Sequence, residues 1–147
     1  MVISASQTAP VDTVAQCAAW MALDLEIDRL SLRWSQIETT MAEKHDWFRL
    51  TQAQRRALPQ AAEMYEIDER LKVLFRQRRL DLKGLVKLKA ESLHAVASKL
   101  AVAARILQYE ENTAQPLIAA AVRELAGARC EKCGVSLLPD LPARAVR

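Results

Sequence analysis

The chain has 147 residues, of which 51% are hydrophobic and 27% charged, a balance typical of globular and not of disordered proteins. It contains only 3 Gly and 5 Pro, which argues against an all-β fold with many turns and favours helices. The net charge of +3 is unevenly spread: residues 1–48 carry three basic and seven acidic groups, whereas residues 49–89 carry eleven basic and five acidic groups.

Three features bear on the cellular compartment. No apolar run reaches about 18 residues, so we expect no transmembrane helix. The first residues lack a basic start followed by an apolar stretch, so we expect no signal peptide. Three cysteines cannot form a fully paired disulfide scaffold. The sequence therefore predicts a cytoplasmic protein that has no membrane partner.

Residues 1–11 are expected to be a flexible lead-in, and Asp12 or Thr13 can cap the first helix. A long, coiled-coil-like helix of about 35 residues then follows, because apolar residues alternate at spacings of three and four. This stripe consists of Trp20, Leu23, Ile27, Leu30, Trp34, Ile37 and Met41. A second apolar stripe on the front half consists of Val14, Ala18, Met21, Leu25 and Leu32.

The next segment predicts a short helical turn and a second helix. Thr51 and Gln54 have the spacing of a capping box. Pro59 ends the short turn, and a helix is predicted from about residue 59 to 80. Its expected core residues are Met64, Ile67, Leu71 and Leu74, with Phe75 beside them.

Asp81 and Gly84 predict a tight connection at residues 80–84, and the alternative is one kinked helix that continues through them. The third predicted helix runs to about Tyr109, and a fourth runs from about Pro116 to Ala128. The apolar stripe of the third helix comprises Val86, Leu93, Val96, Leu100, Ala103 and Leu107, with Ala97, Ala101 and Ala104 beside it.

Short connections make neighbouring helices antiparallel. The predicted fold is therefore all-α, an elongated antiparallel bundle of about four helices. Residues 12–128 would form a single helical-bundle domain, and residues 129–147 would hold a Cys-x-x-Cys-Gly stretch and a loose tail.

A basic run between Arg70 and Lys89 contains eight basic residues and one acid, Asp81. Within it Lys72, Arg76, Arg79 and Lys83 recur at helical spacing, and Lys87 continues the series. This stripe has three interpretations. It can bind the phosphates of nucleic acid, bind an acidic protein partner, or complement the acidic face of the first helix, which comprises Asp24, Glu26, Asp28 and Glu38.

Cys130, Cys133 and the following glycine resemble one knuckle of a zinc ribbon, but the second pair of ligands is missing. In an antiparallel bundle His94 would lie near the two cysteines, which gives a weak candidate set of three zinc ligands: Cys130, Cys133 and His94. Zinc shared between two chains is a further possibility. The other interpretations are a redox pair and plain reduced thiols with no cofactor, and plain thiols are the simplest. We interpret Cys17 as a packed core thiol.

No phosphate-binding loop, dinucleotide fingerprint or nucleophile elbow occurs, so the sequence indicates no catalytic residues and no small-molecule substrate. A thiol-redox or metal-dependent activity is the enzymatic alternative. The leading hypothesis is a non-enzymatic interaction, adaptor or assembly protein that uses its long helical surface and its basic stripe. The alternative is a regulatory protein that binds nucleic acid. Since the first helix is predicted to be longer than the second, its uncovered stripe also predicts a homodimer.

Overall fold

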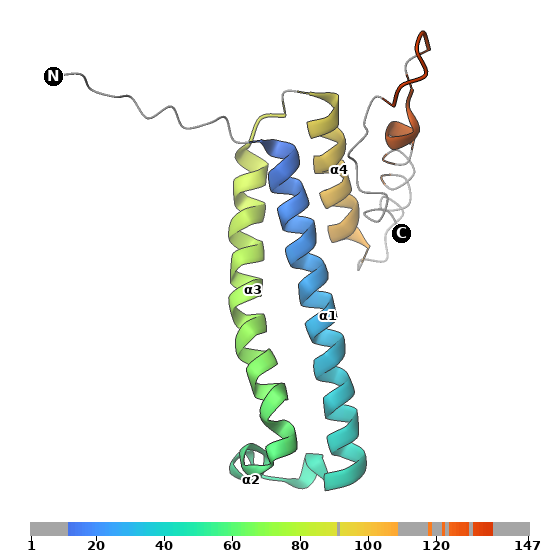
Figure 1. The fold of residues 1–147 in the computed structure, drawn as a ribbon. Helices are drawn as coiled ribbons and strands as arrows, with labels where there is room; N and C mark the ends of the chain where they lie inside the picture. The colour runs from blue at the N-terminus through green and yellow to red at the C-terminus, as the bar shows by residue number, and fades with distance from the viewer. Residues whose placement is uncertain are drawn as a thin grey trace, which may run out of the picture. The chain divides into compact units, whose positions relative to one another are not determined.

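The computed structural model describes residues 12–90, 92–108, 118, 122, 124–129 and 131–136. The fold is all-α, as predicted from the sequence, with α1 Thr13–His45, η1 Trp47–Arg49, α2 Gln52–Ala57, η2 Pro59–Ala61, α3 Ala62–Lys87 and α4 Leu93–Leu107 (Figure 1). The chain falls into two compact units, one formed by Trp20–Gly84 and the other by the described parts of Met1–Ala19 and Leu85–Arg147. No described helix is long and apolar enough to span a membrane.

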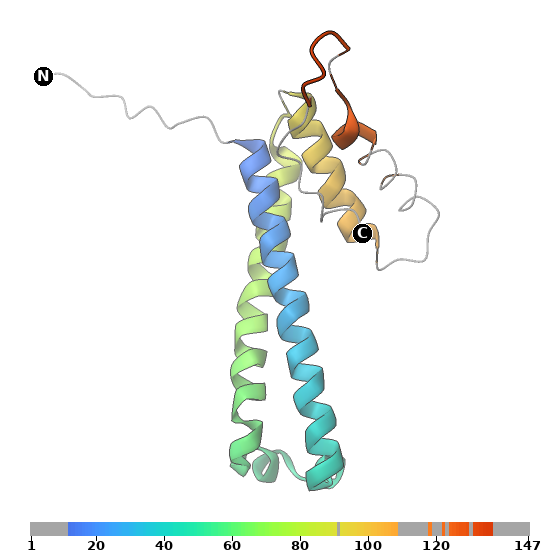
Figure 2. The same ribbon diagram turned by 45° about the vertical axis from the view of Figure 1, so that its right-hand side comes forward.

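The Trp20–Gly84 unit is an antiparallel helical hairpin. Residues 20–45 of α1 and 62–84 of α3 run side by side in opposite directions, and the chain turns through α2 at one end (Figures 1 and 2). A heptad stripe on each helix buries apolar side chains against the other, which explains why a long helix is stable here. The core comprises Ile27, Leu30, Ile37 and Met41 from α1, Met64, Ile67 and Leu74 from α3, and Trp47 and Ala61 from the connection.

The predicted stripe of the first helix is confirmed: its members from Ile27 to Met41 are buried or half-buried. This coverage removes the uncovered stripe that motivated the homodimer prediction. The second predicted stripe is mostly wrong, because Leu25 and Leu32 are exposed. Phe75 also differs from the prediction, since it is exposed and does not join the core.

Local signals fix the start of α1 and of α2. The Asp12 carboxylate accepts a hydrogen bond from the Val14 N–H at 3.0 Å, which satisfies an amide that has no partner within the helix. Thr51 and Gln54 form the predicted capping box, in which each side chain bonds the other residue's backbone amide, at 3.3 and 2.8 Å.

The predicted break at residues 80–84 is wrong, because α3 continues through Gly84 to Lys87. Asp81 does not cap a new helix; its carboxylate accepts a hydrogen bond from the Gln77 amide at 2.6 Å, one turn earlier on α3. A glycine in an exposed helix costs only about 1 kcal/mol, and burial of Leu85 one residue later offsets that cost.

In the other unit, the chain leaves α3 after Lys87, and Ser92 caps α4 by accepting a hydrogen bond from the Ala95 N–H at 3.0 Å. The buried face of α4 differs from the predicted stripe, because Leu93 and Val96 are exposed. Small side chains are buried there instead, namely Ala95, Ala97, Ser98, Ala101, Val102 and Ala104. Cys17 and Thr13 of α1 are buried in the same unit, as predicted for Cys17.

The fourth predicted helix lies mostly outside the described residues. Of the residues described there, 118, 122 and 124–127 are helical, and Val122 is buried. The predicted lead-in 1–11, Pro116 at the predicted start of the fourth helix, and the tail after Ser136 also lie outside the described residues.

Candidate functional site

The candidate interface is the outer side of α3, opposite its buried residues. It carries the four predicted cations Lys72, Arg76, Arg79 and Lys83, all of them exposed, and we call these four residues the basic face. Because α3 is unbroken over this stretch, spacings of four, three and four place the four side chains on one side of one helix. The stretch from Lys72 to Lys83 contains 12 residues and spans about 16 Å of helix. Lys87, on the last turn of α3, is also exposed.

The members of the basic face differ in their ion pairing. Lys72 lies 2.7 Å from the Glu69 carboxylate and 3.1 Å from that of Asp68. The hydrogen bonds that its ammonium donates to these carboxylates, first to Glu69 and then to Asp68, raise the pKa of Lys72. Arg76, Arg79 and Lys83 form no ion pair with any residue that the structure describes. Three of the four cations are therefore available to a partner.

Exposed apolar side chains accompany these cations. Val73 and Leu80 are 56% and 55% exposed, and Phe75 is exposed as well. With 3.6 residues per turn, Val73 and Leu80 lie on one side of the cations and Phe75 on the other. The outer side of α3 is thus both cationic and partly apolar, which the charge pattern alone did not predict.

Charge complementarity between α1 and α3 exists. Asp24, one of the predicted acids, takes part in it with a cation outside the basic face, and another ion pair uses residues outside the prediction. Arg33 of α1 donates two hydrogen bonds of 2.7 Å to the Glu63 carboxylate of α3. These hydrogen bonds from Arg33 stabilise the ionised carboxylate and so lower the pKa of Glu63. Glu26 is bound in the same way by Arg29, three residues along α1, which lowers the pKa of Glu26.

A second ion pair between α1 and α3 is buried. Asp24 of α1 has a side chain only 2% exposed, and it lies 2.8 Å from the Nε of Arg78, whose side chain is 26% exposed. The Arg78 guanidinium also lies 5.3 Å from the centre of the Trp20 ring, and the Trp20 indole N–H donates to the Arg78 carbonyl at 3.1 Å. Asp24 is therefore a core residue that pairs with a cation of α3, as the complementarity interpretation allowed, although its partner Arg78 is not one of the four residues of the basic face.

The predicted zinc ligands are not assembled in the described part of the chain. Cys130 lies outside the described residues, Cys133 is exposed and free, and His94 is half-buried with a buried Nε2 that has no hydrogen-bond partner. Among the described residues, no group of three or more His, Cys, Asp and Glu side chains could hold a metal ion. Zinc binding by Cys130, Cys133 and His94 stays a prediction.

The backbone around Cys133 nevertheless forms a closed turn. Gly134 has a φ of 70°, a conformation that favours glycine, and residues 129 and 136 form an isolated antiparallel bridge. The Arg129 guanidinium donates a hydrogen bond of 3.1 Å to the Gly134 carbonyl. Cys17 differs from Cys133, because burial raises the pKa of the Cys17 thiol and makes it less reactive.

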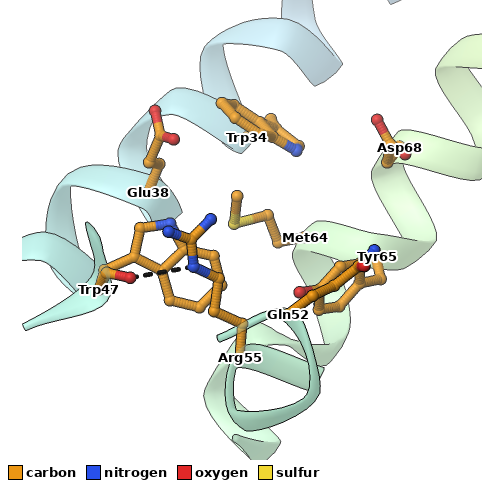
Figure 3. Close-up of a pocket in the computed structure, with 8 residues that line it drawn as sticks. All are labelled: Trp34, Glu38, Trp47, Gln52, Arg55, Met64, Tyr65 and Asp68. Atoms are coloured by element: carbon orange, nitrogen blue, oxygen red, sulfur yellow. Dashed lines mark hydrogen bonds between the residues drawn. The ribbon is translucent and has the colours of Figure 1, made fainter. Parts of the chain in front are cut away.

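The structure also contains a pocket that the sequence did not predict. It has a volume of about 370 Å³ and lies within the Trp20–Gly84 unit, where α1, η1, α2 and α3 meet (Figure 3). Its lining residues are Trp34, Glu38, Trp47, Gln52, Arg55, Met64, Tyr65 and Asp68. They come from four elements, so only the folded chain brings them together.

Comparison with protein-family models, curated proteins and solved structures finds no match to this chain.

Proposed function

We propose that this chain is a non-enzymatic interaction protein whose basic face binds an acidic, partly apolar segment of a partner protein. The observation that carries the proposal is the composition of the outer side of α3. Arg76, Arg79 and Lys83 are exposed and unpaired among the described residues, and Val73 and Leu80 are exposed beside them. A partner segment with carboxylates and apolar side chains would complement both features.

Two physical effects would contribute to binding. Carboxylates of the partner would accept charge-assisted hydrogen bonds, which are stronger than neutral ones. Burial of Val73 and Leu80 would add a hydrophobic contribution of about 25 cal/mol per Å² of apolar surface. A polyanion such as nucleic acid would use the cations but would leave the apolar side chains in water, so the pair of features favours a protein.

The test places a photo-crosslinking residue at Leu80, beside the basic face on the outer side of α3, in the otherwise unchanged full chain. We expect it to form a crosslink with one acidic protein, which mass spectrometry then identifies. The purified partner should bind the chain directly, and its affinity should fall as salt is raised.

Charge reversal tests the same point with a matched control. Arg76→Glu, Arg79→Glu and Lys83→Glu together should abolish binding of that partner. The control reverses three exposed cations elsewhere in the same unit, with Lys44→Glu, Arg49→Glu and Arg70→Glu. Binding that survives the first set, or that both sets weaken equally, would contradict the proposal.

Nucleic acid is the alternative partner, and the three exposed, unpaired cations are the observation that favours it. In that case the purified chain should carry material that nuclease removes. Its affinity for a duplex should then fall steeply with salt, in proportion to the number of phosphates contacted. Weak binding that hardly changes with salt would exclude this alternative.

The zinc hypothesis has its own test. Metal analysis of protein purified without added zinc, combined with its mass in solution, distinguishes a site shared by two chains from free thiols. A metal-free monomer in which Cys130 and Cys133 react freely with an alkylating reagent would exclude zinc.

A further inference from the structure

We infer that the pocket between Trp34, Trp47 and Tyr65 binds a small alkylated ammonium cation. This site is separate from the basic face. Its volume of about 370 Å³ lies in the range of about 300–1,000 Å³ that is usual for small-molecule sites. The inference depends on three properties of the lining: its aromatic rings, its carboxylates and the position of Arg55.

Aromatic and thioether groups form the apolar part of the lining. Trp34, Trp47 and Tyr65 contribute three rings, and the buried Met64 contributes its sulfur. In Figure 3 the Met64 side chain lies between these rings and below Trp34. The face of an aromatic ring is electron-rich and attracts cations, most strongly when the cation has a small hydration cost. An alkylated ammonium has that property and also an apolar surface that matches this lining.

Two carboxylates supply the negative charge. Glu38 and Asp68 lie on opposite sides of Trp34 and Met64 (Figure 3). Asp68 is shared with Lys72 at 3.1 Å, whereas Glu38 forms no hydrogen bond or ion pair with any residue in the described ranges. Because Glu38 has no counter-charge among the described residues, its carboxylate can attract a cationic ligand to the pocket.

Arg55 is the one cationic side chain of the lining, and its geometry shows how it is held. Its guanidinium lies 4.9 Å from the centre of the Trp47 ring and donates hydrogen bonds to the carbonyls of Trp47, at 3.0 Å, and Phe48, at 3.4 Å. These hydrogen bonds to backbone carbonyls hold the Arg55 guanidinium over the Trp47 ring. Arg56 stacks on Tyr65 in a similar way, 5.1 Å from the ring centre. Both rings already bind cations, and Trp34 has no such arginine stacked on it among the described residues.

The charges of the lining therefore comprise two carboxylates and one guanidinium. The proposal assigns the ammonium centre to the space beside Trp34 and Met64, between Glu38 and Asp68. An anionic ligand would be repelled by both acids, and a neutral one would gain no ionic attraction from them.

The test uses choline and its uncharged carbon analogue, in which a tert-butyl group replaces the trimethylammonium group. Both are titrated into the full chain at constant ionic strength, and the indole N–H resonances of Trp34 and Trp47 are followed by NMR. A Trp34→Phe variant assigns the Trp34 signal. We expect choline to shift both resonances with a Kd on the order of 1 mM, and the carbon analogue to bind at least about fivefold more weakly.

Two matched variants test whether the carboxylate of Glu38 attracts the choline cation. Glu38→Gln keeps the size of the side chain and should weaken choline binding about fivefold. Glu66→Gln removes the same charge from an exposed residue of α3 that does not line the pocket, and it should leave binding unchanged.

Several outcomes would overturn the inference. These are no saturable shift with choline, equal affinity for the carbon analogue, shifts that avoid Trp34 and Trp47, or equal effects of the two glutamate variants. Thermal melting of both variants will show that each remains folded.

Discussion

The inner and outer sides of α3 carry the same type of side chain in contrasting surroundings. Arg78 points to the core side, where it pairs with buried Asp24 and stacks on Trp20. Arg79, the next residue, is exposed on the basic face and has no ion pair with a described residue. One step of about 100° around the helix therefore separates a structural arginine from an available one. Net charge over a segment cannot distinguish the two roles.

The largest expected effect is a difference in stability between these two arginines. Arg78→Met removes the counter-charge of a buried carboxylate and should lower the free energy of unfolding by about 3 kcal/mol. Arg79→Met should change it by less than about 0.5 kcal/mol. Urea denaturation of the two variants measures the difference directly. Equal destabilisation would mean that the ion pair with Asp24 adds nothing to the free energy of unfolding beyond what an exposed arginine adds.

A substitution at Gly84 tests whether α3 is continuous, and the basic face depends on that continuity. A Cβ at this position meets nothing within 4 Å, and the residue is helical and exposed. Gly84→Ala should therefore stabilise the chain by about 0.5–1 kcal/mol, as alanine does in a helix interior. A loss of stability on thermal melting would instead favour the tight connection at residues 80–84 that the sequence suggested.

The exposed pair of Arg33 and Glu63 should respond to pH. Hydrogen bonds from Arg33 lower the pKa of Glu63 below its ordinary value of 4.5. The pair therefore adds stability above that pH, and the contribution is lost as the pH falls through the lowered value. Glu63→Gln should be less stable than the unchanged chain at about pH 6, and the difference should shrink towards about pH 3. Denaturant midpoints at both pH values test this, and a constant difference would contradict it.

The smallest effect is expected on the outer side of α1. Leu32 is 62% exposed, so Leu32→Glu should change the free energy of unfolding by less than about 0.5 kcal/mol. Light scattering of the same variant, beside that of the unchanged chain, tests the homodimer prediction. If the chain is a dimer that uses Leu25 and Leu32, the variant should become monomeric; a dimer that persists would place the interface elsewhere.

Much of the hairpin could be predicted from the sequence, because its signals are local or periodic. The capping box depends on two residues three positions apart, Thr51 and Gln54, and the stripe from Ile27 to Met41 depends only on helical spacing. The break at residues 80–84 was predicted wrongly, since Asp81 and Gly84 are local signals that the burial of Leu85 outweighs. The Ser92 cap that starts α4 was missed because, with the break placed at residues 80–84, Ser92 fell inside the third predicted helix.

The sites were predictable to different degrees. The basic face follows from helical spacing and was found, whereas its apolar neighbours and the unpaired state of Arg79 needed solvent exposure and ion pairs. The pocket was missed entirely, because Trp34, Trp47 and Tyr65 lie on three different elements and look like core residues in the sequence. Glu38 was noticed only as part of an acidic face.

The buried contact between Asp24 and Arg78 also constrains the alignment of α1 with α3. Apolar heptad stripes are tolerant of slippage, because a shift of seven residues again brings aliphatic side chains together. Such a shift here would leave Asp24 buried without its guanidinium and would separate the Trp20 indole from the Arg78 carbonyl. A single charged residue in the seam thus selects one register of the hairpin out of several that its hydrophobic pattern would accept.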